Sequence, residues 1–164
     1  MKDGLPKLQE SAGFSQSREM VLLDLLKKAT DFYEDIIGLL SGIYELSEYV
    51  RRGSPEDEFY SYVVKILVRE SRCENASVFL VEGNRVVLKA AAGIELPGEV
   101  PAASMELGEG VAGTRAREGK PILVADVHEC RYYKEFPGSQ VQIGSMLCIP
   151  IKDGETTFGV LNLS

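Results

Sequence analysis

The sequence predicts an α+β fold: an antiparallel sheet of six strands, or five if the last is truncated, flanked by helices and preceded by a long helix. Apolar residues recur at alternating steps of three and four from Leu22 to Val50, which indicates the long helix. Two pairs of apolar runs are each joined by a tight turn, at Gly83 and Gly154, which indicates two β-hairpins. A single short helical stretch separates the hairpins, so the pattern is not that of a parallel sheet.

The composition is typical of a globular protein and argues against several classes of partner. Of 164 residues, 45% are apolar and 26% are charged, and the net charge is −7. Nucleic acid and anionic membrane surfaces repel such a chain, so neither is expected as a partner. The three cysteines lack metal-binding spacing and there is one histidine, so we expect no metal site and a reducing, cytoplasmic location. No apolar run reaches membrane-spanning length.

The N-terminal part is predicted to be a flexible leader over residues 1–17, which has no apolar period, and a helix over residues 18–52. The apolar positions of that helix keep a heptad spacing, which is typical of helices that supercoil around one another. The alternative is one long amphipathic helix that packs on its own domain in a monomer. The predicted homodimer seam consists of Leu22, Leu25, Phe32, Ile36, Leu39, Ile43, Leu46 and Val50.

Residues 54–164 are predicted to form a separate domain. Ser54 as N-cap and Pro55 in the first turn indicate a second helix that ends near Arg72. From Asn75 onward the apolar period becomes two, which indicates strands, and several of these are apolar on both faces. The strands are expected over residues 76–81, 85–91, 104–107, 122–126, 144–151 and 156–163, with a helix over residues 111–118 and an aromatic loop over residues 128–142.

The segment from Gly108 to Gly113 matches the G-x-G-x-x-G pattern of dinucleotide-binding proteins. The helix that follows has room for only about two turns, and the preceding strand is short. The flanking hairpins also contradict a repeated strand–helix–strand unit. We therefore interpret the glycines as residues that allow close backbone packing at a helix start, where free N–H groups could also bind a ligand oxygen.

The ordered set of motifs resembles a GAF domain, the ligand-sensing relative of PAS domains. It comprises a hairpin, the Leu-Gly-Glu-Gly-Val-Ala-Gly helix start at residues 107–113, the strand Gly-Lys-Pro-Ile-Leu-Val-Ala-Asp-Val at residues 119–127, an aromatic loop, and a final hairpin. The resemblance implies a six-stranded sheet, a ligand pocket on its helix-and-loop side, and dimerisation through terminal helices. It also implies a regulatory role beside an output domain in a larger signalling protein. The usual C-terminal helix of the family is missing.

The candidate ligand-binding residues lie in and around the loop after the short helix. Asp126 ends a strand and is either a cap for the next turn or a pocket acid. The loop aromatics could line a pocket or pack as core, since both uses need the same residue types. The candidate set is Asp126, Tyr132, Tyr133, Phe136, Gln142 and Ser145. The ligand stays unknown, because no haem, bilin or metal signature is present.

Two other functions stay open. The free methionine sulfoxide reductases share the GAF fold, and residues 126–128 and 136–138 faintly resemble their active-site loop. No cysteine follows Phe136-Pro137-Gly138 here, and sulfoxide reduction needs a thiolate and a resolving thiol, for which only Cys130 and Cys148 are candidates. The other alternative is a domain that binds nothing and serves as a dimerisation spacer. We therefore expect a non-enzymatic sensor with no catalytic residues.

Overall fold

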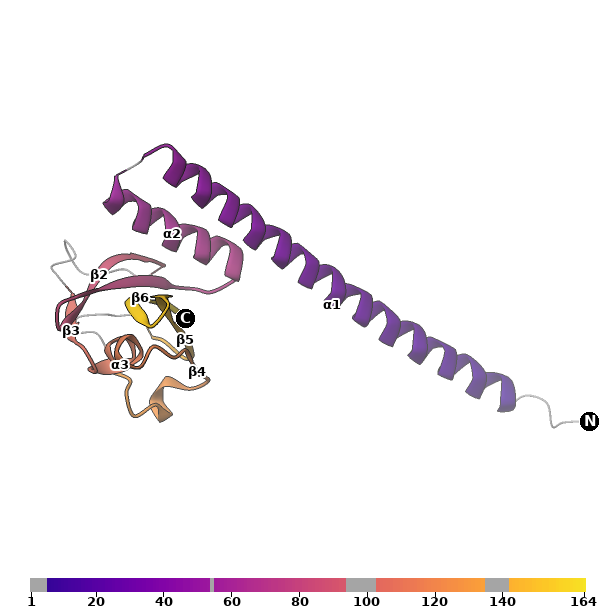
Figure 1. Ribbon diagram of the computed structural model, residues 1–164. Coiled ribbons are helices and arrows are strands. Elements are labelled where there is room, and N and C mark those ends of the chain that lie inside the picture. Colours follow the sequence, from indigo (N-terminus) through magenta and orange to yellow (C-terminus); the bar gives the residue numbers. More distant parts are fainter. Residues whose placement is uncertain (1–5, 54, 94–102, 135–141) are drawn as a thin grey trace, which may run out of the picture. The chain divides into compact units, whose positions relative to one another are not determined.

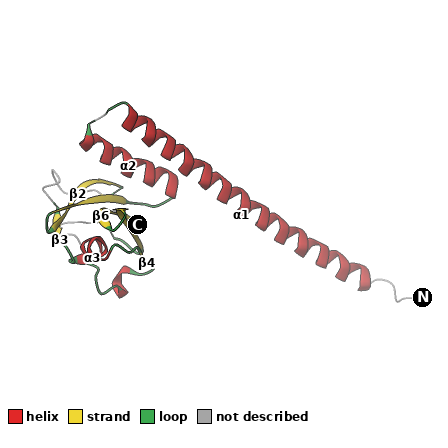
Figure 2. Ribbon diagram, in the orientation of Figure 1, coloured by secondary structure: helices red, strands yellow, loops and turns green. Residues whose placement is uncertain are grey.

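The computed structural model describes residues 6–53, 55–93, 103–134 and 142–164. Figures 1 and 2 show its helices and strands. The chain divides into two units, Met1–Ser41 and Gly42–Ser164. None of the helices within the described ranges is both long enough and apolar enough to cross a membrane. The elements in chain order are α1 (Pro6–Arg51), α2 (Glu56–Ser71), β1 (Ala76–Glu82), β2 (Arg85–Ala92), β3 (Ser104–Glu106), α3 (Gly110–Glu118), β4 (Ile122–Val124), the 3-10 turn η1 (Val127–Glu129), β5 (Met146–Asp153) and β6 (Thr156–Leu163).

The first unit is the N-terminal part of α1. This helix begins at Pro6 and not at the predicted residue 18. The flexibility expected of the leader over residues 1–17 stays a prediction. Proline is tolerated in a first helical turn, and a helix propagates more easily than it nucleates. The helix formed by the strongly periodic stretch therefore extends further toward the N-terminus. Residues 1–5 lie outside the described residues.

The apolar side chains of α1 are largely uncovered. Of the predicted seam, Ile36 and Leu46 are half-buried. The remaining members are exposed, with 61% of Phe32 and 61% of Ile43 accessible to solvent. The exposed seam members are Leu22, Leu25, Phe32, Leu39, Ile43 and Val50.

In the second unit, the end of α1 packs on α2. A Cβ atom on Gly42 would lie 2.7 Å from Ile66 Cγ2, so glycine permits the close approach of the two helices. The rings of Tyr49 and Tyr62 stack with centroids 4.7 Å apart. Glu45 accepts hydrogen bonds from the Tyr62 hydroxyl at 3.0 Å and from Arg69 Nη2 at 2.9 Å. The predicted N-cap of α2, Ser54, lies outside the described residues.

The sheet confirms the prediction of six antiparallel strands, in the order β3-β2-β1-β6-β5-β4. The two hairpins form as expected, with β1 paired to β2 and β5 paired to β6. The first and last strands of the domain, β1 and β6, pair with each other at the centre of the sheet. Ser164 N donates to the Asn75 carbonyl at 2.9 Å and closes this central pair at one end.

The sheet is covered on both faces, as its doubly apolar strands predict. In Figure 1, α2 lies on one side of the sheet and α3 on the other. The α2 face packs around Val64, Ala76, Val78 and Ala90. The α3 face packs around a larger set that includes Phe79, Val86, Val111, Cys148 and Val160.

Candidate ligand site on the α3 face of the sheet

The glycines at the start of α3 allow the backbone of the preceding turn to pack closely against the helix. Gly108 has a φ of +97°, which disfavours a side chain, and a Cβ atom on Gly113 would lie 2.4 Å from the Glu106 carbonyl oxygen. Thr114 Oγ1 donates a hydrogen bond to the Gly108 carbonyl at 3.0 Å and holds the turn against the helix. The interpretation of these glycines as residues for close packing is therefore confirmed.

Two of the backbone donors around this turn are already used. Gly108 N donates to the Gly113 carbonyl at 2.8 Å, and Glu109 N donates to the Glu106 carbonyl at 2.9 Å. A phosphate-binding loop needs such N–H groups to point at the ligand. These two amides therefore cannot bind a ligand oxygen in the way that the G-x-G-x-x-G pattern suggests.

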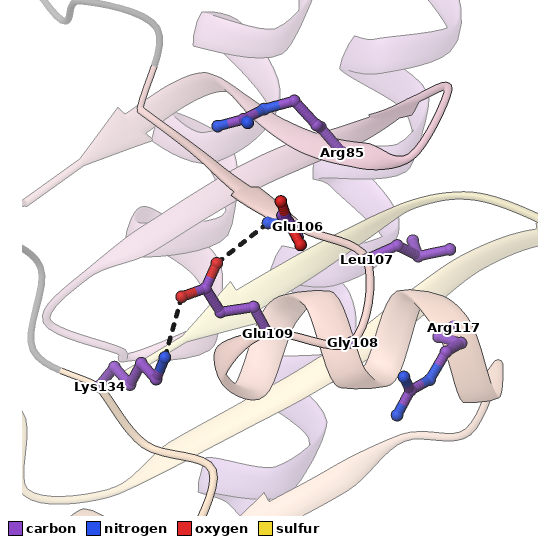
Figure 3. A pocket seen from close by; sticks show the side chains of 7 residues that line it. All are labelled: Arg85, Glu106, Leu107, Gly108, Glu109, Arg117 and Lys134. Carbon is purple, nitrogen blue, oxygen red and sulfur yellow. Dashed lines mark hydrogen bonds and ion pairs between the residues drawn. The ribbon is translucent and has the colours of Figure 1, made fainter.

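An open polar hollow of about 620 Å³ lies beside the same turn (Figure 3). Glu109 accepts hydrogen bonds from Lys134 Nζ at 2.9 Å and from the Glu106 amide at 3.2 Å, and these two partners lower the pKa of the Glu109 carboxyl. Arg85 donates to Ser104 Oγ. Two charges of the hollow, those of Glu109 and Lys134, therefore pair with each other. Its lining consists of Arg85, Glu106, Leu107, Gly108, Glu109, Arg117 and Lys134.

A different set of polar groups is buried between α3 and the sheet. We call Ser77, Arg115, Cys148 and Asn162 the polar cluster. Asn162 is the register partner of both Ser77 and Cys148, so these three side chains share one face of β1, β6 and β5. Cys148 belongs to the apolar core on the α3 face, which identifies that face. Arg115 approaches from α3, the helix that packs on it.

Arg115 is a buried cation. The residue is 8% exposed, its Nη2 lies 2.9 Å from Glu118 Oε2, and its guanidinium carbon lies 5.4 Å from the centre of the Tyr132 ring. A buried charge is strongly destabilising unless it is paired and hydrogen-bonded. The Nε atom of Arg115 is buried, and none of the described residues hydrogen-bonds to it.

Cys148 is a fully buried member of the polar cluster. Burial raises the pKa of its thiol to about 12, although the nearby positive charge of Arg115 acts in the opposite direction. The thiol therefore stays protonated at neutral pH and is a weak nucleophile. Within the described residues, no three His, Cys, Asp or Glu side chains gather into a metal site.

Two of the predicted site residues lie against the α3 face. Tyr132 and Tyr133 are half-buried and pack against its apolar core. The guanidinium groups of Arg115 and Arg131 both lie over the Tyr132 ring, at 5.4 Å and 4.5 Å from its centre. Such cation–π contacts orient both arginines. The loop therefore brings an aromatic ring to the polar cluster, and ligand binding by Tyr132 and Tyr133 stays a prediction.

Three of the other predicted site residues, Asp126, Gln142 and Ser145, are not brought into the polar cluster. Asp126 is exposed, and its Oδ1 accepts a hydrogen bond from His128 N at 2.9 Å, so it caps η1 as one of the two interpretations expects. Gln142 and Ser145 precede β5 and have exposed side chains. Phe136 lies outside the described residues. A ligand contact from these four residues stays a prediction.

The sequence did carry a signal for two of the polar-cluster residues that the predicted site set lacks. Arg115 follows Val111 by four positions, so it belongs to the same buried stripe of the short helix. Asn162 follows Val160 by two positions on β6 and therefore points to the same face. A charged or amide side chain at an otherwise apolar position is the kind of signal that marks a site.

The comparisons with known proteins agree with this architecture. The family model for the GAF domain matches residues 53–164. The chain belongs to the GAF family. No functionally characterised relative matched in sequence.

Solved structures share the GAF fold at low sequence identity. The nlh2 GAF domain of A. aeolicus in an inactive state matches with a TM-score of 0.66 and 20% identity, over 79% of this chain and 80% of that chain. The GAF domain of a phosphoenolpyruvate-protein phosphotransferase from Coxiella burnetii matches with a TM-score of 0.65 and 21% identity, over 77% of each chain. A free methionine-R-sulfoxide reductase from Neisseria meningitidis matches with a TM-score of 0.52 and 20% identity, over 65% of this chain and 60% of that chain.

Proposed function

We propose that this GAF domain is a regulatory, non-enzymatic module that binds a small ligand on the α3 face and relays the bound state to an output domain through a dimeric α1. The observation that carries the proposal is the alternation of side chains along the central strands. Ser77 and Asn162 belong to the polar cluster, while Val78 and Leu161 pack on the opposite face, in the core that α2 covers. A ligand that displaces Ser77 and Asn162 would therefore also displace β1 and β6, the strands on which α2 packs from the opposite face.

The α2 helix connects the sheet to the end of α1. Tyr62 stacks on Tyr49 and, with Arg69, hydrogen-bonds to Glu45. The hydrogen bonds from Arg69 and Tyr62 lower the pKa of Glu45, so the carboxylate stays ionised and keeps accepting them. Shifts of one packed helix past another are a common way to transmit binding, and these contacts would pass such a shift to α1.

The exposed seam of α1 supports a homodimer. Large apolar patches that stay exposed in one chain mark sites of protein association. A heptad spacing specifies a second helix as the partner, because only a supercoiled pair keeps such a seam buried along its whole length. We therefore propose that two copies of α1 pair through the seam residues.

The polar cluster favours sensing over the two alternatives. A domain that served only as a spacer would bury apolar side chains at this place, whereas here two polar atoms lack partners. A thiol redox enzyme needs an ionised thiol, and the raised pKa of Cys148 opposes one. We propose that ligand binding, and not thiol chemistry, is the role of this face.

The expected surroundings follow from composition. The three cysteines are unpaired, which supports a reducing, cytoplasmic setting. The net charge of −7 supports proteins and small molecules as partners, and argues against nucleic acid and membrane lipid.

Native mass spectrometry of the full chain, purified without denaturation, tests the proposal. We expect a dimer mass with added mass from a bound small molecule. The double variant Leu25→Lys with Phe32→Lys places charge in the seam and should give monomers, because a buried charge opposes helix pairing. The matched control Lys27→Glu changes charge on an exposed position of the same helix and should stay dimeric. A wild-type monomer without added mass across micromolar concentrations would contradict both parts of the proposal.

A further inference from the structure

Two buried polar atoms on the α3 face have no hydrogen-bond partner within the part of the chain that the structure describes. They are Arg115 Nε, which is a donor, and Asn162 Oδ1, which is an acceptor. The great majority of buried polar atoms in folded proteins are hydrogen-bonded, so each exception needs an explanation. These two exceptions come from facing elements, α3 and β6, which pack against each other. Asn162 is the register partner of Cys148, and the positive charge of Arg115 acts on the thiol of the same Cys148.

The surroundings of Arg115 leave one edge of its guanidinium group available. Glu118 Oε2 lies 2.9 Å from Arg115 Nη2, and the guanidinium carbon of Arg115 lies 5.4 Å from the centre of the Tyr132 ring. Arg131 shares that ring, so a second positive charge lies close to the first. The Nε–H group is thus a buried donor without a partner among the described residues, and a second positive charge lies nearby. Such a donor prefers a carboxylate or phosphate oxygen.

The surroundings of Asn162 leave its oxygen available. Its Nδ2 donates to Ser77 Oγ at 3.4 Å, which directs the amide along the sheet toward β1. The residue is 9% exposed, so water does not freely reach the oxygen. A group that bound here would have to offer an N–H or O–H donor to satisfy Oδ1.

We propose that the polar cluster binds a small carboxylate that carries a neighbouring hydrogen-bond donor, an α-amino or α-hydroxy acid. Its carboxylate would accept from Arg115 Nε, and its ammonium or hydroxyl group would donate to Asn162 Oδ1. This inference rests on the proposed sensing function and specifies the ligand class. A ligand that satisfies both orphan atoms stabilises the folded chain, because the unbound state leaves both atoms unpaired.

Ligand titrations of the full chain, followed by two-dimensional NMR and by thermal unfolding, test the proposal. The probes are L-alanine, L-glutamate and L-lactate, with acetate and inorganic phosphate as comparators. We expect at least one amino or hydroxy acid to bind, and to bind about 10-fold more tightly than acetate, which lacks the donor for Asn162. Equal binding of acetate, binding of phosphate alone, or no binding of any probe would overturn the proposal.

Matched variants separate binding from folding. Arg115→Lys keeps the charge and removes Nε, and should weaken binding by about 10- to 100-fold. Arg117→Lys makes the same change at an exposed position of α3 and should bind like the wild type. Asn162→Leu replaces the amide by an apolar side chain of similar shape, and should fold at least as well while losing the preference over acetate.

If Asn162→Leu keeps that preference while it remains folded, the assignment of the acceptor is wrong. Native mass spectrometry distinguishes the failure of this inference from the failure of the sensing function. A different molecule bound to the wild type would overturn only the ligand class. A wild-type chain without any bound molecule would contradict sensing as well.

Discussion

The two faces of the sheet differ in the polarity of the side chains that they bury. On the α2 face, the buried residues are the aliphatic Val64, Ala76, Val78 and Ala90. On the α3 face, an apolar core of similar kind surrounds Ser77, Arg115, Cys148 and Asn162. The same two central strands supply both faces, so the difference lies in alternate residues of one sequence and not in separate elements.

The comparison shows where the domain stabilises itself and where it can respond. A closed aliphatic layer gains stability from every contact that it makes. A face with a buried cation and unpaired polar atoms gives up part of that stability until a ligand supplies the missing partners. A local arrangement that lowers the stability of the folded domain is a common signature of a functional site.

The largest expected effect is a charge in the aliphatic layer. Val64 is 1% exposed at the centre of the α2 face, so Val64→Asp should lower the free energy of unfolding by at least about 4 kcal/mol. Urea denaturation monitored by circular dichroism measures the change. Lys65→Asp, at the exposed neighbouring position of the same helix, should change it by less than about 1 kcal/mol. If both variants unfold alike, the α2 face is not the closed core that the comparison requires.

The next effect is a pH dependence from the α3 face. Burial raises the pKa of Cys148 from 9.0 to about 12, so in this range the unfolded chain loses a proton that the folded chain keeps. The contribution of the protonated thiol to the free energy of unfolding is complete below the unfolded pKa of 9.0. It is lost as the pH rises toward the folded pKa of about 12, by up to about 1.4 kcal/mol per pH unit. Urea denaturation from about pH 8 to about pH 11 should show this slope in the wild type.

The variant Cys148→Ala isolates the contribution of the thiol. Lysines and tyrosines titrate equally in both proteins, so the difference between the two pH profiles belongs to Cys148. The variant should be less stable at neutral pH because of the cavity, yet fall less steeply above about pH 9. Parallel profiles would show that the thiol is accessible to water in the folded chain.

The smallest effect concerns the edge of the α3 face. Asp126→Ala removes the acceptor for His128 N and should cost about 1 kcal/mol, whereas Asp126→Asn keeps an acceptor and should cost a few tenths. Thermal unfolding measures both. The same two variants, titrated with the carboxylate probes, separate the two interpretations of Asp126. A loss of ligand binding in Asp126→Asn at unchanged stability would make it a pocket acid and not only a cap.

Much of the fold could be predicted because its signals are local. The turns at Gly83 and Gly154 each join runs of period two, and each formed the expected hairpin. The short helix between them begins and ends within one residue of its predicted bounds, since Gly119 stops it in a left-handed conformation. The start of α1 was misplaced because helix extension depends on the neighbouring turns more than on an apolar period.

The candidate site could be predicted only in part. Tyr132 and Tyr133 were identified because aromatic residues in a loop must either pack or bind, and they lie against the α3 face. Arg115 was missed, since a charged residue in a short amphipathic helix is expected on its solvent side. Asn162 was missed for the corresponding reason on a strand. The local spacing places them on the same face as Val111 and Val160, but their burial itself depends on residues far away in the chain.

By itself, the sequence determined the kinds of element, their order and the antiparallel pairing, because turn chemistry and apolar periodicity act over a few residues. The resemblance of its ordered motifs indicated the family. Only the tertiary structure decided that β1 and β6 meet at the centre of the sheet and that α3 lies over one face of it. That meeting of distant segments places Arg115, Cys148 and Asn162 together and withdraws them from water. Burial, which turns ordinary polar side chains into groups that need a partner, is a property of the assembled fold.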